Sequence, residues 1–217
     1  MADEHHLVAD ATGVFPDPQD VFINIPFDVR CERLYVALIA GLCSFGLIPR
    51  SVLEIPPTKD RLERIFRRIQ ACGASIHDLS RVQLDRAAPR CPRFNMPFEL
   101  GLAVALELAN PGRHHWFVFE EKRHRLQKSL SDLNGFDPLI HGGTPDGMMH
   151  AITNAFVTVR PQAINPTASH MLRVHRSLIA FARQTLKQQE GMPTLFAAGP
   201  FRRLVTAAQE IARQIGL

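Results

Sequence analysis

The chain is organised around one stretch, Arg90-Cys91-Pro92-Arg93-Phe94-Asn95-Met96-Pro97-Phe98-Glu99-Leu100-Gly101-Leu102-Ala103. It has the pattern of a helix start: Asn95 or Met96 is expected at the N-cap, and Pro97 suits the first turn, where its missing N–H costs nothing. Glu99 then falls where the helix macrodipole favours an anion. Gly101 has no side chain, which allows another backbone or a ligand to come close. Taken alone, the stretch leaves two interpretations of Glu99, a helix-stabilising charge or a functional carboxylate.

Short apolar runs alternate with helical patterns on both sides of this stretch. Strands are expected at 21–25, 47–55, 74–80, 114–120 and 136–141, and helices at 28–45, 60–72, 97–109, 122–133 and 145–159. The helix at 28–45 has an apolar stripe of Leu34, Leu38, Leu42 and Phe45, and the helix at 97–109 has one of Phe98, Leu102, Ala105 and Leu106. Alternating strands and helices predict an α/β fold. We expect a mostly parallel five-stranded sheet with helices on both faces, flavodoxin- or Rossmann-like.

The sequence divides into a lead-in at 1–19, an α/β domain at 20–160 and a C-terminal helical hairpin at 165–217. Pro16 and Pro18 are expected to block regular structure in the lead-in. The hairpin consists of two amphipathic helices, at 167–189 and 200–215. It is expected to pack either on the α/β core or on a partner.

Composition narrows the functional classes. A hydrophobic content of 46% is ordinary for a soluble protein that buries a core. The sequence has no apolar run of about 18 residues and no signal-peptide pattern, so no membrane association is expected. Four scattered cysteines without a CxxC pair indicate neither a zinc site nor a disulfide framework, which fits a reducing, cytoplasmic location. The histidine pairs at 5–6 and 114–115 lack a further ligand at metal spacing, so no metal is expected. A net charge of +4 is compatible with a phosphate-bearing ligand but too dispersed for duplex nucleic acid.

Polar residues follow two of the predicted strands. In parallel sheets ligands bind outside the carboxyl ends of the strands. The end of the first strand carries Asn24, Pro26, Phe27 and Asp28, and the end of the third carries Asp78, Ser80 and Arg81. Glu99 begins the next helix at the same edge. Three carboxylates and one amide are therefore expected to converge on one crevice.

Three segments carry a family resemblance: Val21-Phe22-Ile23-Asn24-Ile25-Pro26-Phe27-Asp28, Ser75-Ile76-His77-Asp78-Leu79-Ser80 and Met96-Pro97-Phe98-Glu99-Leu100-Gly101-Leu102-Ala103. In this order they resemble the nucleoside 2-deoxyribosyltransferase-like family and the related bacterial Toll/interleukin-1 receptor (TIR)-like group, over about residues 20–160. The resemblance implies cleavage of an N-glycosidic bond in NAD, a deoxyribonucleoside or a nucleotide. It implies that Glu99 is catalytic and that Asp78 contacts the base. NAD or the nucleotide is then the substrate, and no cofactor is expected.

The implied chemistry suits these residues. Breaking a C1′–N bond builds positive charge on the sugar, which a carboxylate stabilises or captures covalently, and we assign this role to Glu99. The leaving base needs a proton or a hydrogen bond, and Asp78 is the candidate. The substrate-binding candidates are Asn24 and Asp28 for sugar hydroxyls, Arg81 and Arg93 for phosphate, together with Phe27, Asn95 and Met96.

Each candidate also has a structural interpretation. Asp78 could cap a turn, and Asn24 could be a buried, hydrogen-bonded amide at a strand end. Asp28 could be the N-cap of the following helix. Arg81 and Arg93 could belong to a solvated loop.

The sequence departs from the family pattern in its aromatic residues. Deoxyribosyltransferases usually carry a tyrosine in the first strand, where this chain has Phe22; its single tyrosine, Tyr35, falls inside a helix. This favours hydrolysis or a shifted substrate over transfer. The resemblance further implies an effector of a bacterial anti-phage system, a homo-oligomer held in check by a protein or nucleoprotein regulator. The alternatives are a catalytically inactive nucleotide-sensing or protein-interaction module, and a scaffold that assembles through the hairpin.

Overall fold

The computed structural model describes residues 16–82, 91–160, 165–190 and 193–217. In chain order the elements are β1 (Asp17–Asn24), α1 (Glu32–Ser44), β2 (Ile48–Ser51), α2 (Arg61–Gln70), β3 (Cys72–Asp78), α3 (Asn95–Ala109), β4 (His115–Glu120), α4 (Leu126–Ser129), β5 (Leu139–Ile140), α5 (Pro145–Val159), α6 (Ala168–Lys187) and α7 (Ala198–Gln214). Most of the expected lead-in, and residues 83–90 of the loop before α3, lie outside the described residues.

The five strands form one parallel sheet in the order β2-β1-β3-β4-β5. In the register of the central strands, Ile23 of β1 lies opposite Ile76 of β3, which lies opposite Phe117 of β4. The predicted α/β class, with its five-stranded parallel sheet and C-terminal helices, is confirmed. The strand order reverses between β1 and β3, because the chain runs outward to β2 on one side and to β4 on the other. This reversal is the point where open α/β sheets form a ligand crevice.

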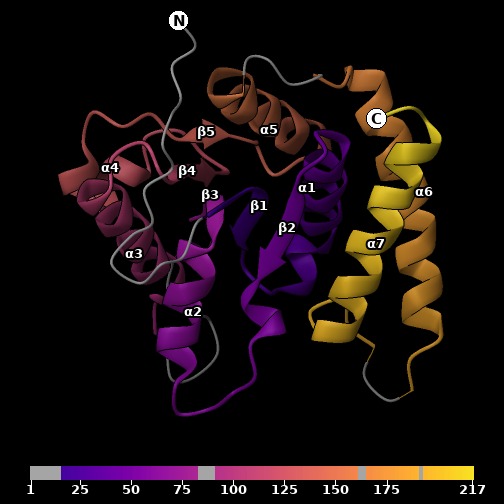
Figure 1. Cartoon of the computed structure of the whole chain (residues 1–217), viewed down its shortest axis with the longest axis horizontal. Helices are drawn as coiled ribbons and strands as arrows, with labels where there is room; N and C mark the ends of the chain where they lie inside the picture. The colour runs from indigo at the N-terminus through magenta and orange to yellow at the C-terminus, as the bar shows by residue number, and fades with distance from the viewer. Residues whose placement is uncertain (1–15, 83–90, 161–164, 191–192) are drawn as a thin grey trace, which may run out of the picture.

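Helices cover both faces of the sheet (Figure 1). Strand alternation sends Phe22 to the face where it packs with Ile65 of α2 and Leu106 of α3. The neighbouring Ile23 points to the opposite face, where it belongs to one hydrophobic cluster with Ile152 of α5 and the residues of α1. The alternation continues to the ends of the strands. It therefore determines which side chains at the carboxyl edge lie on the same face of the sheet.

Several expected boundaries are wrong for local reasons. β1 includes Pro18, which was expected to block regular structure. The register between β1 and β3 shifts between Asp17 and Val21, and such an irregularity tolerates proline. β2 stops at Ser51, because Ser51 and Glu54 form a capping box that starts a 3-10 turn.

The helix expected at 122–133 is also shorter than predicted. It is reduced to α4 and a 3-10 turn at Ser131–Leu133, and Leu126 is the only residue of these two elements that is buried. Short helices without an apolar face to pack are marginal. β5 is likewise limited to two residues within the strand expected at 136–141.

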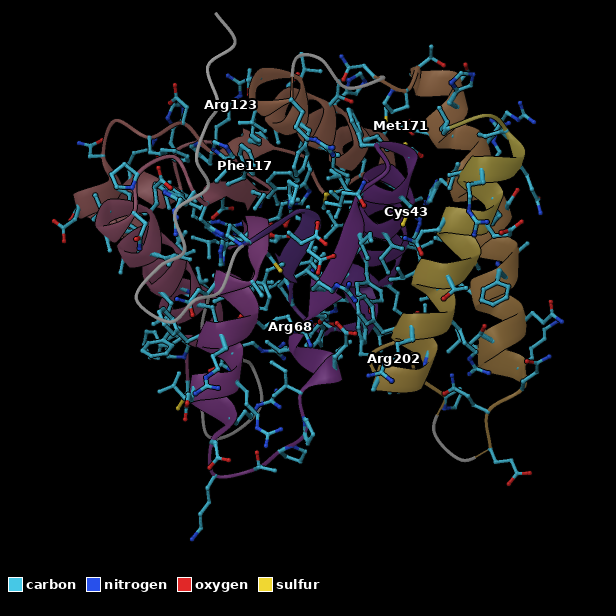
Figure 2. The ribbon with its side chains drawn as sticks, viewed as in Figure 1. Cys43, Arg68, Phe117, Arg123, Met171 and Arg202 are labelled. Atoms are coloured by element: carbon cyan, nitrogen blue, oxygen red, sulfur yellow. The ribbon has the colours of Figure 1, made fainter. Side chains whose placement is uncertain are left out.

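Helix α1 is buried on every side, whereas the sequence analysis expected a single apolar stripe. Every residue from Leu34 to Ser44 is buried. The sheet and α5 cover one side of the helix, and α6 and α7 cover the other side (Figure 1). The C-terminal hairpin therefore packs on the α/β core. Cys43 of α1 and Met171 of α6 belong to one hydrophobic cluster, and Figure 2 places them where α1 meets the C-terminal helices.

Removing an apolar side chain from this interface should destabilise the whole chain. Leu178 of α6 is fully buried in the cluster that contains α1. We expect Leu178→Ala to lower the free energy of unfolding by about 3 kcal/mol, because it leaves a cavity. Leu108→Ala is the control, since Leu108 is 77% exposed, and it should change stability by less than about 0.5 kcal/mol. Urea denaturation measures both, and equal effects would contradict a shared core.

Two further features bear on the environment of the protein. Cys31, Cys43 and Cys72 are buried free thiols, and Cys91 is an exposed one. Within the described segments, no helix has the length and apolar character needed to cross a membrane.

Candidate active site at the carboxyl edge of the sheet

Helix α3 begins earlier than its sequence indicates. Asn95 is its first residue and Phe94 its N-cap, so the expected N-cap at Asn95 or Met96 is wrong. Pro97 is accommodated as the third residue, because backbone N–H groups in the first turn have no partner in the helix. Glu99 is the fifth residue and lies beyond the first turn. The macrodipole therefore does not explain the presence of an acid at this position.

The buried face of α3 also differs from the expected one. Phe98 is 53% exposed and Ala105 is exposed, although both were expected to point inward. Gly101 is exposed as well, and no described atom lies within 4 Å of where a Cβ would stand, so no described part of the chain uses its missing side chain for a close approach. The inward residues of α3 are Met96, Glu99, Leu100, Ala103 and Leu106.

The Glu99 carboxyl group is buried without an evident structural reason. The residue is 7% exposed, and its Oε2 has neither solvent contact nor a hydrogen-bond partner among the residues that the structure describes. Burial raises the pKa of Glu99 to about 7, and the charge of Arg61 opposes this rise. Arg61 itself is anchored to α2's entry loop, where its Nη1 donates to the Ile55 carbonyl at 2.6 Å. With a pKa near 7, both the protonated and the ionised forms of Glu99 are accessible near neutral pH.

Asn24 ties the end of β1 to the start of α3. Its Nδ2 donates to the backbone carbonyl of Met96 at 3.1 Å and lies 3.1 Å from Nδ1 of His77. The interpretation of Asn24 as a buried, hydrogen-bonded amide is confirmed. Because both amide protons are used within the protein, Oδ1 is the group left to accept a hydrogen bond from a ligand hydroxyl.

Asp78 is held by a different set of residues. Its Oδ1 accepts from the backbone N–H of Ser80 at 2.8 Å, so the expected turn-capping role is confirmed. Its Oδ2 lies 3.5 Å from Nε2 of His141 and has no hydrogen-bond partner. His141 Nδ1 accepts from the Gly143 N–H at 3.0 Å, which leaves the proton of a neutral ring on Nε2. That proton points toward Asp78 and toward Ser80 Oγ, 3.0 Å away.

The two carboxylates reach the carboxyl edge of the sheet from its opposite faces. Asp78 is paired in register with Phe119, and both lie on the side of the cluster that contains α1 and α5. Asn24 is paired with His77, on the side covered by α3. The expected convergence therefore holds for the edge of the sheet, but Asp78 and Glu99 are not joined by any described contact. A ligand would have to lie between them to contact both.

Two other candidates at the end of β1 have structural partners. The Phe27 ring lies 5.5 Å from that of Phe196, which precedes α7, so the C-terminal segment covers it. Asp28 caps a 3-10 turn at Val29–Cys31 by accepting from the Arg30 N–H at 2.9 Å. Asp28 is thus an N-cap, but of the 3-10 turn that precedes α1; the N-cap of α1 itself is Cys31.

The remaining candidates differ in exposure. The Arg81 guanidinium hydrogen-bonds the thiol of Cys31, whose pKa is raised by burial. Met96 contributes its carbonyl to Asn24, while its side chain is buried with Leu100 in the core. Arg93 and Asn95 are exposed at the entry to α3. Arg81 is half-buried.

A buried chain of polar side chains beside Asn24 was not predicted from the sequence. Ser75 and His77 lie in one of the three family-like segments, but neither was assigned a role. Both are fully buried on the α3 face, and His114 joins them. A signal was present, because Ser75 and His77 alternate with apolar Ile76 along a buried strand. Among the described residues, no group of three or more histidine, cysteine or acidic side chains is arranged to hold a metal ion.

Comparison with known proteins adds no assignment. A scan against models of protein families gives no match, and searches of curated proteins and of solved structures find no significant similarity. Function is therefore inferred from the residues at the carboxyl edge of the sheet.

Proposed function

We propose that this protein cleaves the N-glycosidic bond of NAD or of a (deoxy)nucleotide, with Glu99 as the carboxylate that faces the sugar. One observation carries the proposal: a buried carboxyl group with a pKa near 7 and an unpartnered Oε2, one turn from the carbonyl that Asn24 holds. A buried acid without a structural partner at the crevice of an α/β sheet is a typical catalytic group.

The chemistry follows from the charge of the ionised form. Loss of the base leaves positive charge on C1′, and a carboxylate in a site of low dielectric constant stabilises that charge strongly. Asn24 Oδ1 accepts a hydrogen bond from a sugar hydroxyl. We propose that Asp78, on the opposite face of the sheet, contacts the leaving base, because its Oδ2 also has no hydrogen-bond partner among the described residues. A nicotinamide leaves as a neutral molecule, so for NAD this contact positions the base more than it protonates it.

Regulation belongs to the same proposal. In the described part of the chain, Glu99 Oε2 and Asp78 Oδ2 have no contact with solvent, so a substrate that contacts these two oxygen atoms requires neighbouring segments to move. That requirement supports an enzyme held inactive until a protein or nucleoprotein regulator, or homo-oligomerisation, opens the site. A cytoplasmic anti-phage effector is one protein that would behave in this way.

A binding module without turnover is the second candidate. Asp78 Oδ1 and both amide protons of Asn24 are engaged within the protein, and Phe22 is fully buried at the position where transferases carry tyrosine. These features favour recognition of a nucleotide without its cleavage. Such a module would bind ligand equally well after Glu99→Gln and would release no base.

A panel of substrates distinguishes the candidates. Purified wild type and Glu99→Gln are incubated with NAD, nucleosides, nucleotides and 2′-deoxynucleotides over a range of protein concentrations, and released bases are separated by chromatography. We expect release by the wild type and none by the variant. No release by the wild type in any oligomeric state would contradict the enzymatic proposal, and equal release by both proteins would exclude Glu99 from the chemistry.

A further inference from the structure

Four buried polar side chains form a continuous hydrogen-bonded chain on the face of the sheet that α3 covers. Asn24, His77, Ser75 and His114 are each at most 6% exposed. The links are 3.1 Å from Asn24 Nδ2 to His77 Nδ1, 2.9 Å from His77 Nε2 to Ser75 Oγ and 2.8 Å from Ser75 Oγ to His114 Nε2. His114 Nδ1 ends the chain at the Cys72 carbonyl, 2.9 Å away.

The two ends of the chain fix the direction of every proton in it. An amide nitrogen only donates and a carbonyl oxygen only accepts. Asn24 therefore donates to His77 Nδ1, and His77 Nε2–H donates to Ser75 Oγ. The Ser75 hydroxyl then donates to His114 Nε2, and His114 Nδ1–H donates to Cys72. Both rings must be neutral in this arrangement. Burial lowers the pKa of His77 to about 3 and also lowers that of His114, which agrees with neutral rings.

The chain has a consequence for the orientation of Asn24. An asparagine amide can flip by 180°, which exchanges its donor and its acceptor. His77 Nδ1 has no proton and can pair only with the amide nitrogen, so the flipped orientation would lose this bond and also the bond to Met96. The orientation that remains directs Nδ2 to the first turn of α3 and leaves Oδ1 for a ligand. Both groups of the proposed site, Asn24 Oδ1 and Glu99, depend on it.

We propose that His77, Ser75 and His114 are positioning residues, which hold the Asn24 amide in one orientation and thereby fix the start of α3 that carries Glu99. Their effect on turnover rests on the proposed function, whereas their effect on α3 does not. At metal sites, outer hydrogen-bond partners that orient a ligating side chain change metal affinity or activity by about 10- to 100-fold when removed, and we expect an effect of the same order here.

Ser75→Ala tests the proposal with the smallest change, because it removes one hydroxyl in the middle of the chain. Ser44→Ala is the matched control: Ser44 is also buried, and its hydroxyl donates to the Ala40 carbonyl at 2.8 Å within α1. Both variants are compared with the wild type at a temperature where denaturation curves show all three to be folded. Three properties are measured: kcat and KM with the best substrate, hydrogen exchange of the first amides of α3, and the ¹⁵N signals of the histidine side chains.

We expect Ser75→Ala to lower kcat by about 10-fold or more with KM changed less than about threefold. We also expect at least about tenfold faster exchange at the start of α3, where the Phe98 N–H donates to the Phe94 carbonyl, and a mixture of His77 tautomers. Ser44→Ala should leave all three properties unchanged. Unchanged exchange and an unchanged His77 tautomer in Ser75→Ala would overturn the proposal. If the wild type releases no base, the proposed function fails, and exchange and tautomer still decide the positioning role.

Discussion

Glu99→Gln is expected to lower the turnover number by at least about 10³-fold without unfolding the protein. Glutamine has nearly the same shape as glutamate but cannot carry the negative charge that faces C1′ in the transition state. The matched control is Glu107→Gln, further along the same helix. Glu107 accepts backbone hydrogen bonds from Gly112 and His114, and a glutamine oxygen can still accept one of them. Turnover in this control should stay within about twofold of the wild type.

The same role for Glu99 predicts the pH dependence of the reaction. The ionised carboxylate stabilises the sugar cation, and burial raises the pKa of Glu99 to about 7. The rate should therefore be constant above pH of about 8 and fall about tenfold per pH unit well below pH 7. Steady-state kinetics from pH 5 to 9 measure this profile. A rate that increases as the pH falls through 7 would instead indicate that Glu99 acts as a general acid.

The sheet and most helices were predictable because their signals are local. A short, continuous apolar run such as that at 21–25 buries its side chains on both faces only in a strand inside a covered sheet. Helix α5 begins as predicted at Pro145, because Thr144 accepts from the Gly147 N–H as its N-cap. The parallel order of the strands then follows from the alternation of strands and helices. The carboxyl edge, and the candidates on it, follow from that order.

The details of the candidate site were not predictable, because they depend on distant contacts. A helix turns about 100° per residue, so the packing of Met96 and Leu100 against the core places Glu99 inward and Phe98 outward. Asn24 contacts the beginning of that helix from 72 residues away in the sequence. Ser75 and His114 are likewise 39 residues apart. The burial of α1 could have been predicted from the sequence. The residues from Tyr35 to Cys43 are apolar on all sides, and such a pattern predicts a helix that is covered on all sides.

Glu99→Gln should also make the protein more stable, and only above neutral pH. The pKa of Glu99 is about 7 in the folded protein, against an ordinary value of 4.5. A raised carboxyl pKa means that the folded state binds the proton more tightly than the unfolded state. No stability is lost below pH of about 4.5, where both states are protonated. The loss grows as the pH rises to 7 and is complete above it, where it reaches up to about 3 kcal/mol.

Glutamine stays neutral throughout this range, so its side chain adds no pH-dependent loss. Urea denaturation of the wild type and Glu99→Gln should therefore give nearly equal free energies of unfolding at pH 4.5. At pH 8 the variant should be more stable by up to about 3 kcal/mol, while Glu107→Gln should show no such gain. If the free energy of unfolding changes with pH in the same way for the wild type and Glu99→Gln, the carboxyl group is not held in an apolar site. A gain in stability together with a loss of turnover is the combination that distinguishes a functional buried acid from a structural one, because removing a structural acid would destabilise the protein.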